Sequence, residues 1–278
     1  MEPVAQNTET LIRLGLFAGF FLSFSIAEYL WPRKSLTAPK ISRWFGNLSI
    51  TVGNNVLLRL VFIGLGATAV GIAGIAQAKG WGLLSHVNLP PMVVFVLGLL
   101  LLDLAIYAQH LVLHRIPVLW RLHRMHHADT DIDVSTGLRF HPLEIIVSMA
   151  LKIGLIILLG VPPMAVLVFE IVLNATSMFN HTNMALPQSV DRLLRLIVVT
   201  PDIHRVHHSV HEHEYNRNFG FNVPWWDKLF GTYQAQPEDG HDQMLIGLHQ
   251  YRDPKWQSLG GLLAIPFNAD ENAEAGPS

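Results

Sequence analysis

His110-Leu-Val-Leu-His114, His123-Arg-Met-His126-His127 and, much later in the chain, His204-Arg-Val-His207-His208 decide how this sequence folds and what it binds. Residues three and four apart lie on one face of a helix, so each spacing directs imidazoles to one side. Neutral imidazole is a common protein ligand for iron, copper and zinc. These eight side chains exceed what one ion needs, and the sequence therefore predicts two metal ions that share them.

The composition predicts a membrane protein. Of the 278 residues, 50% are hydrophobic and only 14% are charged, and the mean hydropathy is +0.33, which is too apolar for an ordinary soluble chain. The net charge of −2 argues against a nucleic-acid partner. Because there is no cysteine, disulfides, iron–sulfur clusters held by cysteine and cysteine nucleophiles are excluded. The first residues, MEPVAQNTET, carry no basic region, so we expect a permanent anchor rather than a cleaved signal peptide.

Apolar segments long enough to be helices in a bilayer divide the chain. They cover residues 11–31, 48–76, 91–114, 143–160 and 164–181. Val161-Pro162-Pro163 predicts a tight turn, so the last two segments form a hairpin that need not reach the far surface. We divide the chain into anchor helices (1–90), a histidine-rich domain (91–235) and a partly disordered C-terminal tail (236–278).

Basic residues predict the orientation in the membrane. Lysines and arginines cluster after the first segment, around the second histidine cluster and after the last segment, whereas the opposite side has little beyond Lys79. Positive charge marks the cytoplasmic side. The predicted fold is therefore all-α, a polytopic membrane helical bundle with a cytoplasmic histidine-rich helical cap that includes the C-terminus.

Two apolar segments carry polar residues along one helical face. Asp103, Tyr107, His110 and His114 repeat at helical spacing, as do Glu170, Asn174, Ser177 and His181. Ionisable residues in spans usually face the bundle interior and mark function. We expect the two faces to converge, which makes His181 a ninth candidate ligand. Asp103 and Glu170 would hold an imidazole by its free N–H, or each would simply bind a neighbouring helix.

The stretch RFHPLE at 139–144 opens the fourth apolar segment. His141 is a candidate ligand, a donor behind a ligand, or a helix cap, and Glu144 suits the positive end of the helix. Asp191–Val199 predicts a short amphipathic helix at the interface, and 219–233 is rich in Trp and Phe, as expected at headgroup depth. Residues that could bind metal or support a ligand are His141, Asp103, Glu144, Glu170, Asn174 and Ser177.

The absent motifs narrow the chemistry. The sequence has no HExxH zinc-protease motif, no glycine-rich nucleotide loop and no evident Ser–His–Asp arrangement. Histidine-rich dinuclear iron suits oxygen activation, which requires a redox-active metal with open positions. Apolar surroundings suit a lipid that enters from the bilayer. We expect either insertion of one oxygen atom into a C–H bond or removal of two hydrogens.

The spacing of the three clusters resembles that of the fatty acid hydroxylase/sterol desaturase superfamily. RFHPLE, FNHTN at 179–183, TPDIHRVHHS at 200–209 and NRNFGFNVPWWDKLFGTY at 216–233 are similar to segments of bacterial members. The resemblance covers roughly residues 90–235. It implies an integral protein of the bacterial inner membrane that oxidises a fatty acyl, sterol-like, isoprenoid or ether lipid.

The same resemblance implies the cofactors and ligands. It makes metal ligands of the eight cluster histidines together with His181, and it implies two iron ions, with zinc as a substitute in purified protein, and O2 as co-substrate. No haem, flavin or iron–sulfur segment is evident, so we expect a separate electron donor, such as a cytochrome b5-like protein or a ferredoxin. Where some relatives carry a further histidine, this chain has Ser177; water or His141 would fill that position.

Other functions remain open from the sequence. A desaturase would use the same centre as a hydroxylase, because substrate position relative to iron decides the outcome. A non-enzymatic protein with bis-histidine haem would need single histidines paired across facing spans. A metal transporter would need ligands spread through the membrane depth.

Overall fold

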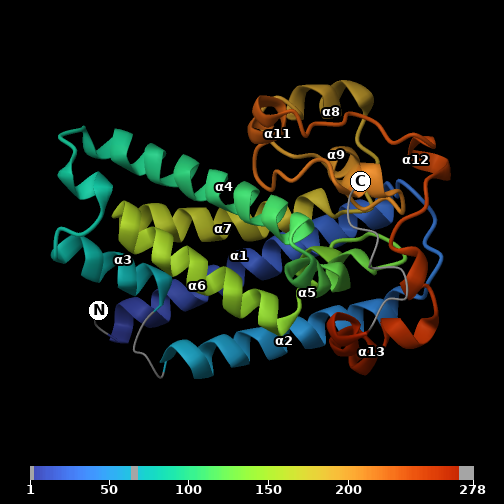
Figure 1. Cartoon of the computed structure of the whole chain (residues 1–278), viewed down its shortest axis with the longest axis horizontal. Helices are drawn as coiled ribbons and strands as arrows, with labels where there is room; N and C mark the ends of the chain where they lie inside the picture. Colours follow the sequence, from blue (N-terminus) through green and yellow to red (C-terminus); the bar gives the residue numbers. More distant parts are fainter. Residues whose placement is uncertain (1–2, 64–67, 269–278) are drawn as a thin grey trace.

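The computed structural model describes residues 3–63 and 68–268 of the chain. Regular secondary structure in these residues is helical, apart from isolated bridges between Pro32 and Met184 and between Ser209 and Ile246. Long helices lie side by side in a bundle, and shorter helices form a cap at one end of it (Figure 1). The predicted all-helical class is confirmed.

The bundle consists of the long helices α1 (Pro3–Leu30), α2 (Lys40–Ile63), α4 (Pro91–Arg115), α6 (Pro142–Leu159) and α7 (Pro163–Asn180). Proline occupies the first turn of α4, α6 and α7, where a helix needs no N–H donor. The helices of the described residues that are long and apolar enough to cross a membrane are Thr8–Leu30, Pro91–Arg115, Pro142–Leu159 and Pro163–Asn180.

The prediction of one apolar helix over 48–76 is wrong, because two separate helices cover this segment. α2 ends at Ile63, and a separate helix, α3 (Ala69–Ala78), begins after Thr68. The Thr68 hydroxyl accepts a hydrogen bond from the N–H of Gly71 at 3.0 Å, and such an N-cap satisfies a donor that only a helix start leaves free. Residues 64–67 lie outside the described residues. α3 packs against α6 and α7 at the end of the bundle far from the cap (Figure 1).

The predicted hairpin of α6 and α7 is confirmed. Gly160 ends α6 in the left-handed conformation, with φ at 69°, and Pro163 starts α7. A Cβ atom added to Gly82, before the short helix η1 (Leu83–His86), would overlap the backbone of Gly160. Glycine is therefore required where this connection crosses the hairpin turn.

Glu170 joins three helices of the bundle instead of supporting a histidine. Its Oε2 accepts a hydrogen bond from Nη2 of Arg13 in α1 at 2.8 Å, and its Oε1 pairs with Lys152 in α6. The amide of Asn174 donates to the Glu170 backbone carbonyl at 2.9 Å. Two cations already compensate this carboxylate, so the predicted supporting role of Glu170 and Asn174 at a ligand is wrong.

The cap contains short helices from the later part of the chain and the segment between α4 and α6. They are α5 (Pro117–His127), η2 (Thr136–Leu138), α8 (Gln188–Leu194), α9 (Pro201–His207), α10 (Glu212–Tyr215), α11 (Trp225–Phe230), α12 (Gly240–Gln243), η3 (His249–Tyr251), η4 (Pro254–Gln257), α13 (Leu259–Ala264) and η5 (Ile265–Phe267). The predicted tail is folded through Asn268: Leu262 and Ile265 pack in a buried cluster with Ile50 and Met125. Residues 269–278 lie outside the described residues.

Successive long helices alternate in direction. α1, α4 and α7 run toward the cap, and α2 and α6 run away from it (Figure 1). The three histidine clusters and the folded C-terminal segment therefore lie at one end of the bundle, while α3 and Lys79 lie at the other. Which end faces the cytoplasm stays a prediction from the basic residues.

Because the chain has no cysteine, single cysteines can test this orientation. Lys79→Cys and His213→Cys place one thiol at each end, on exposed side chains. We expect a membrane-impermeant maleimide to label Lys79→Cys on intact bacterial spheroplasts and His213→Cys only after lysis, because positive charge keeps the cap inside. Unsubstituted protein serves as the unlabelled control. Labelling of His213→Cys but not of Lys79→Cys on intact spheroplasts would show the opposite orientation.

Candidate metal centre

The helices that meet at the cap bring the predicted histidines together. His110 and His114 lie on the last turns of α4, the second cluster lies on α5, and the third lies on α9 and the residue after it. Pro117 begins α5 directly after α4, so the chain turns there and the two clusters face each other. His181 follows α7. All of these side chains except His114 are buried.

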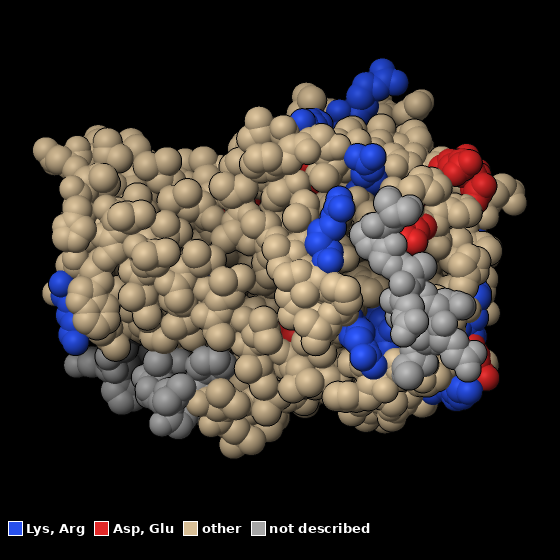
Figure 2. Space-filling view, viewed as in Figure 1, with Lys and Arg blue, Asp and Glu red and all other residues tan. Residues whose placement is uncertain are grey.

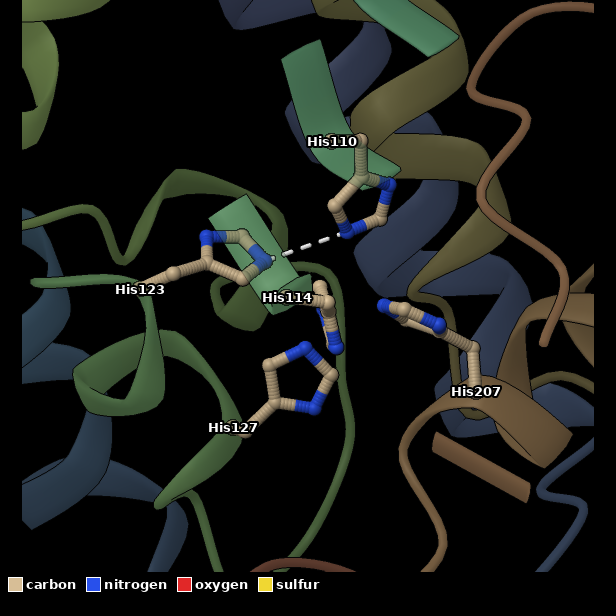
Figure 3. A group of neighbouring side chains, drawn as sticks. All are labelled: His110, His114, His123, His127 and His207. Atoms are coloured by element: carbon tan, nitrogen blue, oxygen red, sulfur yellow. Dashed lines mark hydrogen bonds between the residues drawn. The ribbon is translucent and has the colours of Figure 1, made fainter. Parts of the chain in front are cut away.

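The nine imidazoles form two groups. The five-histidine group contains His110, His114, His123, His127 and His207, and the four-histidine group contains His126, His181, His204 and His208. In each group, one nitrogen per residue lies within 4.8 Å of the others. Figure 3 shows the five-histidine group, whose rings point to a common centre from α4, α5 and α9.

Helical period explains which histidine joins which group. His123 and His127 are one turn apart on α5 and share the five-histidine group, as do His110 and His114 on α4. His126 points elsewhere on α5 and joins the four-histidine group. An HxxHH motif therefore serves both groups, because its last two residues diverge by about 100° around the helix.

The distances within the groups suit a common metal ion. The Nε2 atom of His181 lies 3.1 Å from Nε2 of His126, 3.1 Å from that of His208 and 3.0 Å from that of His204. In the five-histidine group, the Nε2 atoms of His110 and His123 are 3.1 Å apart. Two nitrogens at right angles, each about 2.1 Å from one ion, would be about 3.0 Å apart.

The opposite ring nitrogens set the tautomers. Nδ1 donates to an acceptor in five histidines: His110 to Phe219 O at 2.8 Å, His123 to Glu144 Oε1 at 2.8 Å, His126 to Arg139 O at 3.2 Å, His181 to Ser177 O at 2.6 Å and His207 to Arg217 O at 2.6 Å. Carbonyl and carboxylate oxygens only accept, so these Nδ1 atoms carry the protons. The Nε2 lone pairs then face one another, an arrangement that a cation stabilises.

Unpaired nitrogens in both groups support the same conclusion. Among the described residues, both ring nitrogens of His114 and His127 lack a hydrogen-bond partner, as do Nδ1 of His204 and Nδ1 of His208. Buried polar atoms are normally paired. Burial lowers the pKa of His126, His127, His204 and His208 well below the ordinary value, and neighbouring imidazoles lower it further. These rings are neutral, which is the form that binds a metal. The donor set therefore fits metal ions.

Glu144 lies behind His123, one of the candidate ligands. It lies in the first turn of α6, it is buried, and it accepts the Nδ1–H of His123. Carboxylate partners of this kind fix the ring orientation of ligating histidines and raise their basicity.

Asp103 does not support a histidine. Its Oδ2 accepts a hydrogen bond from the indole of Trp226 at 2.7 Å, and the carboxylate thus fastens α11 to α4. The face that carries Asp103 also carries Tyr107, whose hydroxyl lies 3.0 Å from the Thr232 hydroxyl. Of the predicted face, only His110 and His114 belong to a histidine group, because the 219–233 segment covers Asp103 and Tyr107.

His141 is a helix cap, one of the three roles left open for it. Its Nδ1 accepts a hydrogen bond from the backbone N–H of Leu143 at 3.2 Å, and it lies outside both histidine groups. Ser177 contributes its backbone carbonyl to His181, while its hydroxyl donates to Gly137 O at 2.8 Å. His141 therefore does not replace the histidine that some relatives carry at the position of Ser177.

Sequence reasoning did not predict a buried network of ion pairs that lies next to the histidine groups. Arg43 in α2 donates from Nε and Nη2 to the two carboxylate oxygens of Asp129 at 2.7 and 2.8 Å, and from Nη1 to Asp133 at 2.6 Å. Burial raises the pKa of Asp129, but Arg43 and then Arg139 lower it below its ordinary value. Arg139 also supplies the carbonyl that holds His126. The acidic stretch DTDID at 129–133 was the available signal.

The remaining histidines lie apart from both groups. His211 pairs with Asp239 and His213 with Glu238 on the cap surface, as expected of a solvated turn. His241 is buried, and its Nε2 lies 3.8 Å from Asp202. The two compact groups do not have the arrangement of a bis-histidine haem site, which needs isolated pairs on facing spans. They also differ from a metal transporter, which needs ligands spread through the membrane depth.

The chain is similar to known lipid hydroxylases. Residues 95–232 match a family model described as fatty acid hydroxylase. The chain is 34% identical over 142 residues to ornithine lipid hydroxylase of Rhizobium tropici, covering 51% of this chain and 42% of that protein. It is 32% identical over 139 residues to human alkylglycerol monooxygenase, covering 49% of this chain and 29% of that protein.

A third relative is rat cholesterol 25-hydroxylase, which is 29% identical over 156 residues, or 56% of this chain and 49% of that protein. The chain thus spans less than half the length of these relatives. No solved structure matches it.

Gly137 tests how closely the four-histidine group is held. A Cβ atom at this position would lie 2.5 Å from the Ser177 carbonyl oxygen and 3.2 Å from Nδ1 of His181. Gly137→Ala should therefore displace the carbonyl that orients His181 and weaken metal binding by roughly 10–100-fold, measured by competition with a chelator. Gly154→Ala is the control, since its Cβ would have no atom within 4 Å. Equal metal affinities for the two variants would contradict this role.

Proposed function

Since this chain belongs to the fatty acid hydroxylase/sterol desaturase superfamily, we propose that it hydroxylates a C–H bond of a membrane lipid with O2 and an external reductant. Its relatives are named for action on ornithine lipid, alkylglycerol and cholesterol. These names share lipid as the substrate class and oxygen insertion as the reaction. Helices apolar enough to span a membrane support a substrate that enters from the bilayer.

The observation that carries the proposal is the convergence of nine imidazoles in two groups. Each group would hold one iron ion, and zinc could replace iron in purified protein. Iron at these positions would supply redox chemistry and open positions for O2. The four-histidine group has fewer protein ligands, so it leaves more positions for O2 and for a lipid.

The reaction balances with two electrons and two protons. One oxygen atom of O2 enters the C–H bond to give the alcohol, and the other leaves as water. We propose that a separate carrier, either cytochrome b5-like or a ferredoxin, supplies the electrons one at a time. We also propose that the cap and the C-terminus face the cytoplasm at a bacterial inner membrane.

The chain's own residues orient the ligands and exclude water. Phe140 stacks on His126 with ring centroids 4.6 Å apart, and Phe221 lies 5.1 Å from His110 and 5.9 Å from His204. These apolar walls keep bulk water from the groups. Glu144 and the carbonyl of Arg139 hold His123 and His126 by their Nδ1–H groups, so the Nε2 atoms stay directed inward.

Product analysis with ¹⁸O2 tests the function and separates it from desaturation. Iron-loaded protein in lipid nanodiscs, supplied with bacterial lipids and a reductant, should give products that gain one labelled oxygen atom. We expect His126→Ala and His207→Ala to abolish turnover, because each removes a ligand from one group. His241→Ala, a buried histidine outside both groups, should retain it. Products that lose two hydrogens and gain no label would establish a desaturase instead.

A further inference from the structure

Two aromatic rings connect the five-histidine group with the surface of the cap. Trp120 lies on α5 and Tyr215 at the end of α10. Their rings are stacked, with centroids 5.2 Å apart and an interplanar angle of 13°. The pair joins segments that are distant in sequence, and its inner member touches the proposed ligands.

Trp120 packs on the two ligands that no hydrogen bond orients. Its ring centroid lies 4.7 Å from that of His114 and 5.3 Å from that of His127. Both nitrogens of these two histidines lack a hydrogen-bond partner among the described residues, whereas His110, His123 and His207 are each held through Nδ1. The Tyr215 ring lies 6.2 Å from both His114 and His127.

The pair reaches the surface, unlike the other rings at this group. Trp120 and Tyr215 are half-buried, while Phe219 is fully buried and Phe221 is 8% exposed. Phe140 is also half-buried, and its ring centroid lies 6.4 Å from that of His123. It packs more closely on His126 of the four-histidine group, at 4.6 Å, and its carbonyl accepts a hydrogen bond from Asn54 of the bundle helix α2. Trp120 and Tyr215 belong instead to short cap helices, outside the apolar spans.

The surface beside Trp120 combines apolar and basic side chains. Val118 is 66% exposed and Ile116 is 43% exposed, and Arg115 and Arg121 are exposed on either side of them. On the face drawn in Figure 2, Lys and Arg side chains lie around the position of α5, and acidic side chains gather near α12. An apolar centre with a charged rim is usual for a protein-binding surface, and the rim charge steers partners of opposite charge.

We propose that this surface, formed by Arg115, Ile116, Val118, Trp120, Arg121 and Tyr215 and here called the Trp120 patch, docks a small acidic one-electron carrier protein. Trp120 is then the contact through which electrons pass from the carrier to the five-histidine group. The inference rests on the proposed function, which needs an external reductant. Each carrier molecule loses one electron, the metal centre gains it, and two such transfers accompany each lipid hydroxylation.

Anaerobic stopped-flow spectroscopy separates electron entry from a packing role. Iron-loaded protein in nanodiscs is mixed with a reduced [2Fe–2S] ferredoxin, an acidic one-electron carrier, or with dithionite, a small reductant that needs no docking. For Trp120→Leu we expect the ferredoxin-driven reduction to be lost, while the dithionite-driven rate and the iron content stay at the unsubstituted values. If Trp120→Leu instead loses iron and both the ferredoxin-driven and the dithionite-driven rates, Trp120 only packs the histidines, and the proposal is overturned.

Binding measurements test the patch without electron transfer. The Kd of oxidised ferredoxin for the protein as purified should rise roughly tenfold in Arg115→Glu and in Val118→Asp, and salt should weaken the unsubstituted complex. Arg192→Glu, an exposed arginine on α8, should leave the Kd unchanged. Equal affinities for all these proteins would overturn the proposal. Protein that binds ferredoxin at the patch but never takes up iron would instead contradict the proposed function.

Discussion

The mutual approach of imidazole lone pairs is the constraint on which the rest of the structure depends. His181 directs its Nε2 atom to within 3.1 Å of the Nε2 atoms of His126 and His208 and 3.0 Å of that of His204, and its own proton is bound to the Ser177 carbonyl. Lone pairs brought this close repel one another unless a cation lies between them. A metal ion bound between these nitrogens would relieve the repulsion and contribute directly to the stability of the fold.

The bundle and the cap supply different parts of that arrangement. α4 and α7 bring histidines to the end of the membrane part, and the cap returns further histidines together with backbone carbonyls that fix their tautomers. The Arg43–Asp129 pair ties α2 to the segment that follows α5. Removing one partner of a buried ion pair destabilises the fold, because the other charge is left uncompensated. The pair therefore fixes the segment whose Arg139 carbonyl binds His126.

Local spacing predicted the histidines well, because helical period acts on neighbours in sequence. The HxxxH and HxxHH motifs and the polar face that ends at His181 identified every histidine of the two groups. Partners that depend on tertiary approach were not predictable: Glu170 meets Arg13 and Asp103 meets Trp226 across the fold. Backbone carbonyls leave no side-chain signal, and the start of α3 after Thr68 falls within a largely apolar, glycine-containing stretch.

Metal content per chain tests the central claim most directly. Protein from iron-replete cells, purified in mild detergent, should contain about two metal ions per chain by elemental analysis, one for each histidine group. His204→Ala should lower that content, because it opens the four-histidine group. Less than about one ion per chain in protein that still hydroxylates lipid would contradict a centre built from both groups.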